Sequence, residues 1–428
     1  MLLRLCCILA LLFVTVTAAA EEFSFDTAEL EKKFWHLGGY VEARPGLNLL
    51  DREAAQTRLR YYGLHTDDPL VDFNGKLLLE GSLEKAWAKL FVQPSLDYTA
   101  TRLSNDLKLS WYEAWLQAKP NDSAKLLVGK RSLRWGKGYA WNPVAFFDRP
   151  KNPDDPELNL EGYWLATAEY IRSFDGPLKT LAITPLLLPQ DHDLNSDFGT
   201  ANQLNWGGKL YGLLYDTDID LIVAGRGSRN AAYGLDFSRN LGANLELHGE
   251  LAWQVNTQRP VISASNQTTM YRADSLSWLV GLRYLTEQDA TYIVEYYRNG
   301  NGYSQAEMSN YFNQVERAWS IWQQSGSATQ LQRLGQAQSY NRLSPMRDYL
   351  YARVSQKEPF DLLYFTPAIT SIINLQDKSF SLAPELLYTG ITNLELRLKG
   401  TAAVGAPRSE YGEKQNDARL ELRIRYFF

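Results

Sequence analysis

The C-terminal stretch Leu420-Glu-Leu-Arg-Ile-Arg-Tyr-Phe-Phe428 decides which fold the rest of the chain must fit. Every second residue from Leu420 to Phe428 is apolar, and the residues between them are mostly charged. Because successive side chains of a β-strand point to opposite faces, a strand here has one apolar face and one charged face. An edge strand of a soluble protein can alternate in this way, but it seldom ends the chain on two phenylalanines. In a transmembrane barrel the apolar face meets lipid, the charged face meets water, and the last aromatic residue lies at the interface. The stretch therefore predicts the last strand of a transmembrane β-barrel.

The same stretch resembles the last strand of bacterial outer-membrane β-barrels, which commonly ends in phenylalanine. The resemblance implies a location in the cell outer membrane of a Gram-negative bacterium, surrounded by lipid and lipopolysaccharide. It also implies that the barrel-assembly machinery recognises the C-terminal strand.

The N-terminus has the pattern of a cleavable secretory signal. Arg4 precedes an apolar run, and Ala18, Ala19 and Ala20 precede Glu21. A charge, an apolar run and small residues in this order are typical of a signal peptide. We expect a signal peptide at residues 1–20, a periplasmic lead-in at residues 21–34 and the barrel at residues 35–428. An uncleaved membrane anchor is the alternative, although the apolar run is short for a membrane span.

The composition excludes several classes of function. Both cysteines, Cys6 and Cys7, lie in the expected signal, so the mature chain would have no disulfide, thiol nucleophile or thiolate metal site. The formal net charge of −5 argues against nucleic acid as a partner. The mean hydropathy of −0.34 is typical of a soluble protein, but alternating strands average their two faces. The 25 Tyr and 12 Trp residues suit the aromatic girdles of a barrel.

Segments of alternating polarity follow one another almost continuously from Trp35 to the C-terminus. The connections between them are alternately short and long, and the long ones lie at residues 136–161, 189–204, 257–274, 299–346 and 405–417. Long extracellular loops and short periplasmic turns are typical of an outer-membrane barrel. The alternating segments number about 19, but termini on the same side require an even count. We therefore expect an all-β, antiparallel barrel of about 18 strands, with about 16 as the alternative, and place the surplus segment among residues 36–64.

Residues 305–323, inside the longest loop, have helical spacing. Ser304 and Glu307 form a capping box, and apolar residues then recur three and four positions apart. We expect one helix in this long extracellular loop. It could fold into the lumen as a partial plug, cap the barrel from outside, or simply cover the loop's own apolar residues.

The most distinctive internal passage, residues 126–143, reads Leu-Leu-Val-Gly-Lys-Arg-Ser-Leu-Arg-Trp-Gly-Lys-Gly-Tyr-Ala-Trp-Asn-Pro. It resembles a Gly-Arg/Lys, Trp-Gly, Pro passage of large porin-like families, including alginate-export-type and uncharacterised porin-type barrels. The resemblance implies a loop that folds inward and narrows the channel opposite a basic wall. An ordinary extracellular loop is the alternative. The candidate constriction residues of this passage and the loop after it are Lys130, Arg131, Arg134, Lys137, Asp148, Asp154, Asp155 and Glu157.

A second basic set lies near the seam where the barrel would close. Its members have the inward parity of the last two strands, and they are Arg397, Lys399, Arg423 and Arg425. Arg58 and Arg60 have the inward parity of a predicted strand at residues 57–64. Such a cluster in a narrow lumen raises the local potential for anions. The alternative is a balanced ladder, in which Glu42, Glu395 and Glu421 pair with these cations across strands.

Neither a metal site nor a catalytic site stands out. The alternate spacing of a calcium loop occurs at Asp191, Asp193, Asn195 and Asp197. The glycine and the final glutamate of such a loop are replaced by Ser196 and Asn202, so a solvated acidic loop is the better interpretation. The sequence contains four histidines but no nucleophile elbow, zinc-binding pair or phosphate loop. We expect neither an enzyme nor a cofactor.

Together these patterns predict a porin-like outer-membrane channel for passive diffusion of small or oligomeric hydrophilic solutes, with anions as the preferred option. The alternative is a barrel that serves as a scaffold or sheath for a secretion or electron-transfer partner. A homo-oligomer is compatible with both.

Overall fold

The computed structural model describes residues 33–66, 69–200 and 202–428. Trp35–Phe428 forms one compact unit, which contains all of the described residues except Lys33 and Phe34. The expected signal peptide and all but the last residues of the expected lead-in lie outside the described residues. Processing of the N-terminus therefore stays a prediction.

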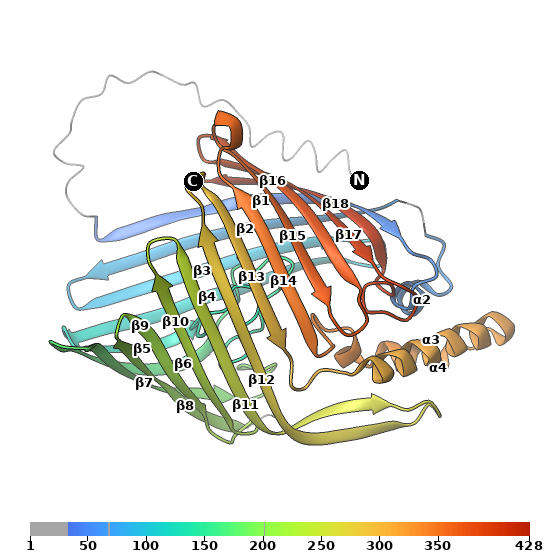
Figure 1. Cartoon of the computed structure of the whole chain (residues 1–428), viewed down its shortest axis with the longest axis horizontal. Coiled ribbons are helices and arrows are strands. Elements are labelled where there is room, and N and C mark those ends of the chain that lie inside the picture. Colours follow the sequence, from blue (N-terminus) through green and yellow to red (C-terminus); the bar gives the residue numbers. More distant parts are fainter. Residues whose placement is uncertain (1–32, 67–68, 201) are drawn as a thin grey trace. The chain divides into compact units, whose positions relative to one another are not determined.

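Within the described residues, the unit that begins at Trp35 is a closed antiparallel β-barrel of 18 strands (Figure 1). β1 (Trp35–Leu50) pairs with β2 (Leu70–Lys85) on one side and with β18 (Asn416–Phe427) on the other, which closes the sheet. Closure gives every strand two neighbours and removes sheet edges. The predicted antiparallel barrel of about 18 strands is confirmed.

The other strands follow in chain order, and each pairs with its neighbours in sequence. They are β3 (Ala88–Ala100), β4 (Asn105–Asn121), β5 (Ala124–Arg131), β6 (Tyr163–Ser173), β7 (Leu178–Gln190), β8 (Gln203–Leu214), β9 (Thr217–Ala224), β10 (Ala232–Leu241), β11 (Leu245–Ile262), β12 (Thr268–Leu285), β13 (Ala290–Arg298), β14 (Asp348–Gln356), β15 (Phe365–Asn374), β16 (Phe380–Ile391) and β17 (Leu394–Val404). The helices are α2 (Ala55–Tyr61), α3 (Gln305–Ser325) and α4 (Thr329–Gly335), with short 3-10 turns at Gln338–Tyr340 and Pro359–Asp361.

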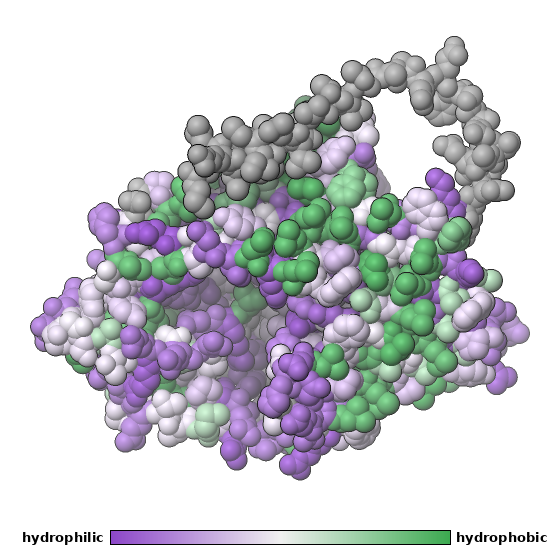
Figure 2. Space-filling model, turned by 180° about the vertical axis from the view of Figure 1, so that it is seen from behind, coloured by the Kyte–Doolittle hydropathy of each residue, from purple (hydrophilic) through white to green (hydrophobic). Residues whose placement is uncertain are grey.

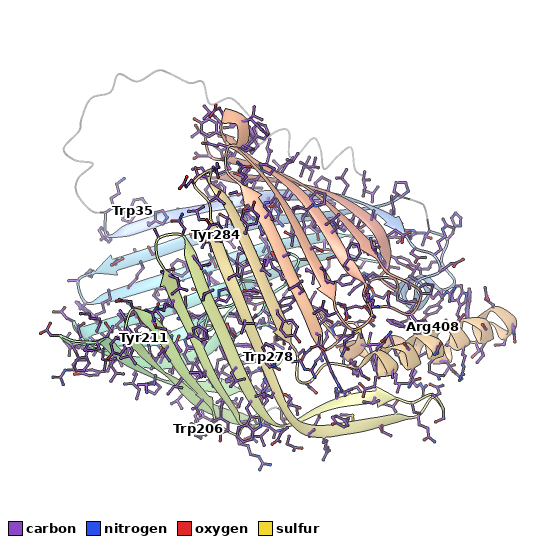
Figure 3. All side chains as sticks on the ribbon, in the orientation of Figure 1. Trp35, Trp206, Tyr211, Trp278, Tyr284 and Arg408 are labelled. Atoms are coloured by element: carbon purple, nitrogen blue, oxygen red, sulfur yellow. The ribbon has the colours of Figure 1, made fainter. Side chains whose placement is uncertain are left out.

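The outer faces of the strands are apolar, as the alternation predicts. In β18, Leu420, Leu422 and Ile424 are exposed on the outside, whereas Arg423 is buried on the inside. Figure 2 shows apolar side chains gathered over the outer strand surface, and a hollow bordered by polar ones. Trp35 and Tyr284 lie near the short-turn ends of their strands and Trp206 near a long-loop end, where aromatic girdles meet the membrane interfaces (Figure 3). No helix among the described residues is long and apolar enough to span a membrane.

The strand predicted at residues 57–64 is wrong, because this segment contains α2. Ala55, Leu59 and Tyr62 are four and three positions apart, and all three pack against the cluster of apolar side chains around α3. Helical spacing buries them on one face, so packing prevails over the strand-like alternation. Arg58 and Arg60 consequently do not line the lumen as members of a strand. Arg58 lies over the ring of Trp319, and Arg60 bonds to the Gln415 side chain.

The long loop predicted at residues 257–274 is also wrong for most of its length. β11 and β12 continue as a paired hairpin beyond a bulge between Gln254 and Thr257, up to the pair Ile262–Thr268. β-branched and aromatic residues favour strand here. Figure 1 shows this hairpin projecting past the barrel beside α3 and α4.

The predicted helix at residues 305–323 is confirmed as α3, and so is its capping box. The Ser304 hydroxyl accepts from the Glu307 N–H, and the Glu307 carboxylate accepts from the Ser304 N–H. α3 buries Met308, Tyr311 and Val315 against Tyr303, Tyr340 and other apolar residues of its own loop, and contacts α2, α4 and β11. It therefore covers apolar residues at the long-loop end of the barrel rather than plugging the lumen.

Candidate functional site

The connection between β5 and β6, residues 132–162, folds into the barrel interior, and we call it the constriction loop. Its backbone amides bond to carboxylates on the opposite wall. The N–H groups of Lys137 and Gly138 donate to Glu250 Oε1 at 2.6 and 2.7 Å. The N–H of Ala140 donates to Glu295 Oε2 at 2.8 Å. Since Glu250 is on β11 and Glu295 on β13, these bonds tie the loop across the lumen.

Asp148 shapes the start of the loop. Its carboxylate accepts from the Ser132 hydroxyl at 3.0 Å and from the backbone N–H groups of Leu133 and Trp135 at 2.7 and 3.3 Å. Burial raises the pKa of Asp148, and these hydrogen bonds partly offset that rise. Asp148 is largely buried and braces the loop, although its side chain also borders a cavity of about 430 Å³.

One side of the lumen is filled with apolar side chains, and we call it the filled side. Trp135, Val144, Phe146 and Phe147 of the loop pack against inward-facing residues of the wall, which are Leu186, Leu188, Ile222, Ala232 and Ala252. Phe147 also stacks on Phe198, with ring centroids 6.1 Å apart. Burying each large apolar side chain contributes roughly 1.5–3 kcal/mol. The packed cluster is therefore a dry core, and a cavity of about 430 Å³ lined by Trp135, Phe146 and Asp148 lies beside it.

Lys137 lies on the filled side with acidic partners. Its Nζ is 3.1 Å from Asp220 Oδ2 and 4.0 Å from Asp236 Oδ1. Lys209 also contacts Asp220, at 3.3 Å. These carboxylates neutralise Lys137, which belongs to the anchoring of the loop and not to its tip.

The tip of the constriction loop faces β17 and β18. Arg423 Nη2 is 2.5 Å from Asp155 Oδ2, and Arg397 Nη1 is 3.9 Å from Asp155 Oδ1. The Lys399 ammonium donates to the carbonyl of Asp154. Burial would raise the pKa of Asp155, but Arg423 and Arg397 hold it below its ordinary value, so the carboxylate stays ionised.

Two cavities lie on this side of the lumen, which we call the open side. A cavity of about 500 Å³ is lined by the long-loop residues Tyr411 and Lys414 and by Asp155, Leu158 and Arg423. A cavity of about 440 Å³ reaches the C-terminal Phe428 at the short-turn end, and Asp155, Leu158 and Arg423 line it as well. The Asp155–Arg423 ion pair therefore lies between the two cavities.

The charges on the open side combine the two alternatives that the sequence leaves open. Arg425 is 2.6 Å from Glu42 and 3.7 Å from Glu395, and Arg423 is 3.7 Å from Glu421, as a balanced ladder requires. Among the described residues, however, the 500 Å³ cavity has an excess of cations. Its basic side chains are Arg44, Arg60, Arg102, Lys399, Lys414, Arg419 and Arg423, and its acidic ones are Asp72, Asp154, Asp155 and Glu421.

Lys130 and Arg131, which were also predicted to line the constriction, lie on β5 before the loop begins. Lys130 shares the outward parity of Leu126 and Val128 and pairs with Glu161, so its assignment to the constriction is wrong. Arg131 lies over the Trp115 ring at 4.6 Å.

Arg134 and Glu157 are both in the loop. Arg134 adopts a φ of 54° and donates to the Asn159 side chain at 3.2 Å. Glu157 accepts from the Tyr139 hydroxyl at 3.0 Å and lies 3.9 Å from Arg397. Glu157 and Arg397 therefore extend the polar contact between the loop and the wall.

The acidic loop at residues 191–197 uses its side chains for local structure. Asp191 accepts from the N–H groups of Asp193 and Leu194, Asn195 bonds to the Trp164 backbone, and Asp197 pairs with Arg149. Among the described residues, no group of three His, Cys, Asp or Glu side chains is placed to hold a metal ion.

Sequence reasoning missed the anchoring carboxylates Glu250 and Glu295. Glu250 lies on the inward parity of β11, where any lumenal carboxylate fits. His248, which is beside it on the same parity, contacts Glu295 at 2.8 Å. An inward glutamate next to an inward histidine in a strand is a weak signal, because a wet lumen accounts for both.

No protein-family model matches the chain, and no curated protein matches it. Among solved structures, it is similar to Pseudomonas aeruginosa OccK5 (OpdH), with a TM-score of 0.52 at 10% identity over 92% of this chain and 98% of that one. It is also similar to Pseudomonas aeruginosa OccK11 (OpdR), with a TM-score of 0.53 at 12% identity over 92% of this chain and 95% of that one. At this identity the likeness concerns the fold alone. The chain therefore shares the closed β-barrel fold of these two proteins.

Proposed function

We propose that the protein is a porin-like channel in the outer membrane of a Gram-negative bacterium, through which small or oligomeric hydrophilic solutes diffuse passively. The observation that carries the proposal is the pair of cavities on the open side, which meet at Asp155, Leu158 and Arg423. Together they extend from the long-loop end of the barrel toward its C-terminus. The barrel fold shared with porins supports the same function.

We further propose that anions pass preferentially. In a lumen with low-dielectric walls, the sign of the lining charge selects the ions that enter. The excess of cations around the 500 Å³ cavity would attract an anion at the long-loop end. The constriction loop would set the size limit, because its tip contacts the wall at Arg423.

The family, the processing and the environment of the chain complete the proposal. The passage at residues 126–143 supports a relation to alginate-export-type and other porin-type barrels. The N-terminal pattern supports cleavage after Ala20, and the alternating pattern of Leu420–Phe428 supports recognition by the barrel-assembly machinery. Lipid and lipopolysaccharide would surround the barrel, and a homo-oligomer is compatible with it.

Single-channel recording in planar bilayers tests the proposal. The wild-type protein should show steady conductance and a reversal potential that favours anions in a KCl gradient. The double substitution Arg423→Glu and Arg425→Glu should move that potential toward cation selectivity, because both side chains lie on the lumenal face of β18. Arg408→Glu, at the long-loop end beside Glu316, is the matched control and should change it little (Figure 3). A closed wild-type barrel that copurifies with a partner would instead support the scaffold alternative.

A further inference from the structure

The two arginines that hold Asp155 have unused hydrogen-bond donors. Among the described residues, the Nε atoms of Arg397 and Arg423 have no hydrogen-bond partner, although both are buried. The two side chains are only 11% and 6% exposed. A buried donor without an acceptor is unfavourable, and a guanidinium offers donors in a planar fork that matches the two oxygens of an oxyanion.

Asp155 uses only part of this donor capacity. It makes one short contact, with Arg423 at 2.5 Å, and its second oxygen stays 3.9 Å from Arg397, beyond hydrogen-bond distance. Other carboxylates surround the guanidinium groups beyond hydrogen-bond distance. Glu157 is 3.9 Å from Arg397, and Glu385 and Glu395 are each 3.7 Å from it. Glu421 and Glu42 are 3.7 and 4.0 Å from Arg423. Among the described residues, hydrogen bonds to the protein therefore use few of the donors of Arg397 and Arg423.

The pair also lies on the path that we propose for the solute. Arg423 and Asp155 border both cavities, and Arg397 borders the one at the short-turn end. A solute that moves from one cavity to the other must pass these side chains. Asp155 is on a loop tip, whereas the arginines are on paired strands, so the carboxylate is the partner that can move away.

We propose that Arg397 and Arg423 form an oxyanion site and that Asp155 is its internal competitor. A carboxylate or phosphate group of the solute replaces the Asp155 carboxylate, and Asp155 returns when the solute leaves. The exchange replaces one anion by another, so it preserves the charge balance among Glu42, Glu395 and the arginines. This inference rests on the proposed function and names the chemistry that the constriction recognises.

Competition from Asp155 keeps the binding of the solute's oxyanion weak enough for transport. A site that is free for only a fraction of the time has an apparent affinity reduced by that fraction. Conduction requires binding that is favourable enough for entry and weak enough for release. Asp155 supplies the second condition, because its return displaces the bound group.

Inorganic phosphate is the probe for the test, added to single channels that carry chloride. Asp155→Asn keeps the shape of the side chain and removes the competing charge. It should lower the phosphate concentration that blocks half of the current by about tenfold, a coupling typical of linked binding equilibria. Asp155→Ser should have the same effect, and it provides the test if the Asn variant does not insert.

Asp154→Asn is the matched control, because it removes the same charge one residue away in the same cavity. The Asp154 contact with Lys399 uses the backbone carbonyl, which the substitution leaves in place. We expect less than about a twofold change for this control, as screening of exposed charges implies. Adding Arg397→Gln to Asp155→Asn should abolish the gain in phosphate affinity.

The outcomes separate the inference from the proposed function. If wild-type protein carries no current, the proposed function fails. If it conducts anions but Asp155→Asn and Asp154→Asn lower the half-blocking concentration equally, only general electrostatics operates and the oxyanion site is overturned. An unchanged half-blocking concentration in Asp155→Asn and Asp155→Ser overturns it as well.

Discussion

The filled side and the open side of the lumen are built by the same loop but in opposite ways. On the filled side, Phe146 and Phe147 are buried against the barrel wall. Carboxylates of the wall accept hydrogen bonds from backbone N–H groups of the loop. On the open side, Asp155 meets arginines whose donors are only partly used, between two cavities. The same loop therefore has one attachment packed in the barrel interior and one polar contact whose hydrogen-bond donors are only partly used, and we expect the second to be the adjustable one.

The loop sequence accounts for this difference. Apolar residues dominate the segment from Trp135 to Phe147, and charged residues dominate the segment from Lys151 to Glu157. Pro150 and Pro153 fix φ where the chain passes from one side to the other. Apolar side chains are buried against the wall, whereas at the charged tip the largely buried Asp155 is compensated by Arg423 and Arg397.

Removing the anchor of the filled side should have the largest effect. The double substitution Glu250→Leu and Glu295→Leu deletes the acceptors of the loop amides, which leaves several buried N–H groups without partners. Each lost anchor should cost about 2 kcal/mol of loop attachment, because buried N–H groups lose a charged acceptor. Single-channel conductance should rise well above that of the wild type, because the loop leaves the lumen.

Glu246→Leu is the control for the anchor variant, since Glu246 lies on the same face of β11 but does not bond to the loop. It should keep the wild-type conductance. A double variant whose conductance equals that of this control would show that the amide contacts do not hold the loop.

The two sides should also respond differently to the loss of apolar volume. Phe147→Ala empties part of a closed core, so it should destabilise the protein by about 3 kcal/mol while conductance changes little. Leu158→Ala borders both cavities and should increase conductance with a loss below about 1 kcal/mol. Denaturant titration of refolded protein in detergent and bilayer recording measure the two quantities. The same response at both positions would remove the distinction between the sides.

The contact of Asp155 with Arg423 and Arg397 should persist at moderately acidic pH. Burial opposes but does not prevent the lowering of the Asp155 pKa by Arg423 and Arg397. For a carboxyl with a lowered pKa, the contact is complete above the ordinary value and is lost as pH falls through the lowered value. The difference in chloride-to-potassium selectivity between wild type and Asp155→Asn should therefore persist from pH 7 to about pH 5. If this difference disappears within that range, Asp155 is not held by the arginines.

A substitution in α3, which lies outside both sides of the lumen, should have the smallest effect on conductance and stability. Ser304→Ala removes the cap of α3 and should cost about 1 kcal/mol of local helix stability. Conductance and selectivity should stay unchanged, because α3 packs on its own loop, on α2 and on β11. Faster proteolysis within the loop would detect the loss, and a change in ion selectivity would place α3 on the solute path instead.

The barrel was predictable because its signals are local. The alternation in Leu420–Phe428 and the capping box at Ser304 depend on residues a few positions apart. Residues 57–64 misled the prediction because Arg58, Leu59 and Arg60 alternate like a strand, whereas burial of Ala55 and Leu59 by distant helices selects a helix.

The open side was partly predictable and the filled side was not. Asp155, Arg397 and Arg423 could be named as candidates because charges on inward parities of strands and in an inward loop must meet in the lumen. The bond from Gly138 to Glu250 joins residues 112 positions apart, and any lumenal glutamate could be its acceptor. Only the folded barrel selects which carboxylate receives the loop.

Chemical modification of single cysteines in conducting channels tests most directly that solutes pass on the open side. The chain is suited to it, because its only cysteines, Cys6 and Cys7, lie in the expected signal peptide. A negatively charged methanethiosulfonate reagent should reduce the current through Thr401→Cys, which borders the 500 Å³ cavity of the open side, and leave Ala252→Cys in the filled core unmodified. Block at Ala252→Cys without block at Thr401→Cys would contradict the account.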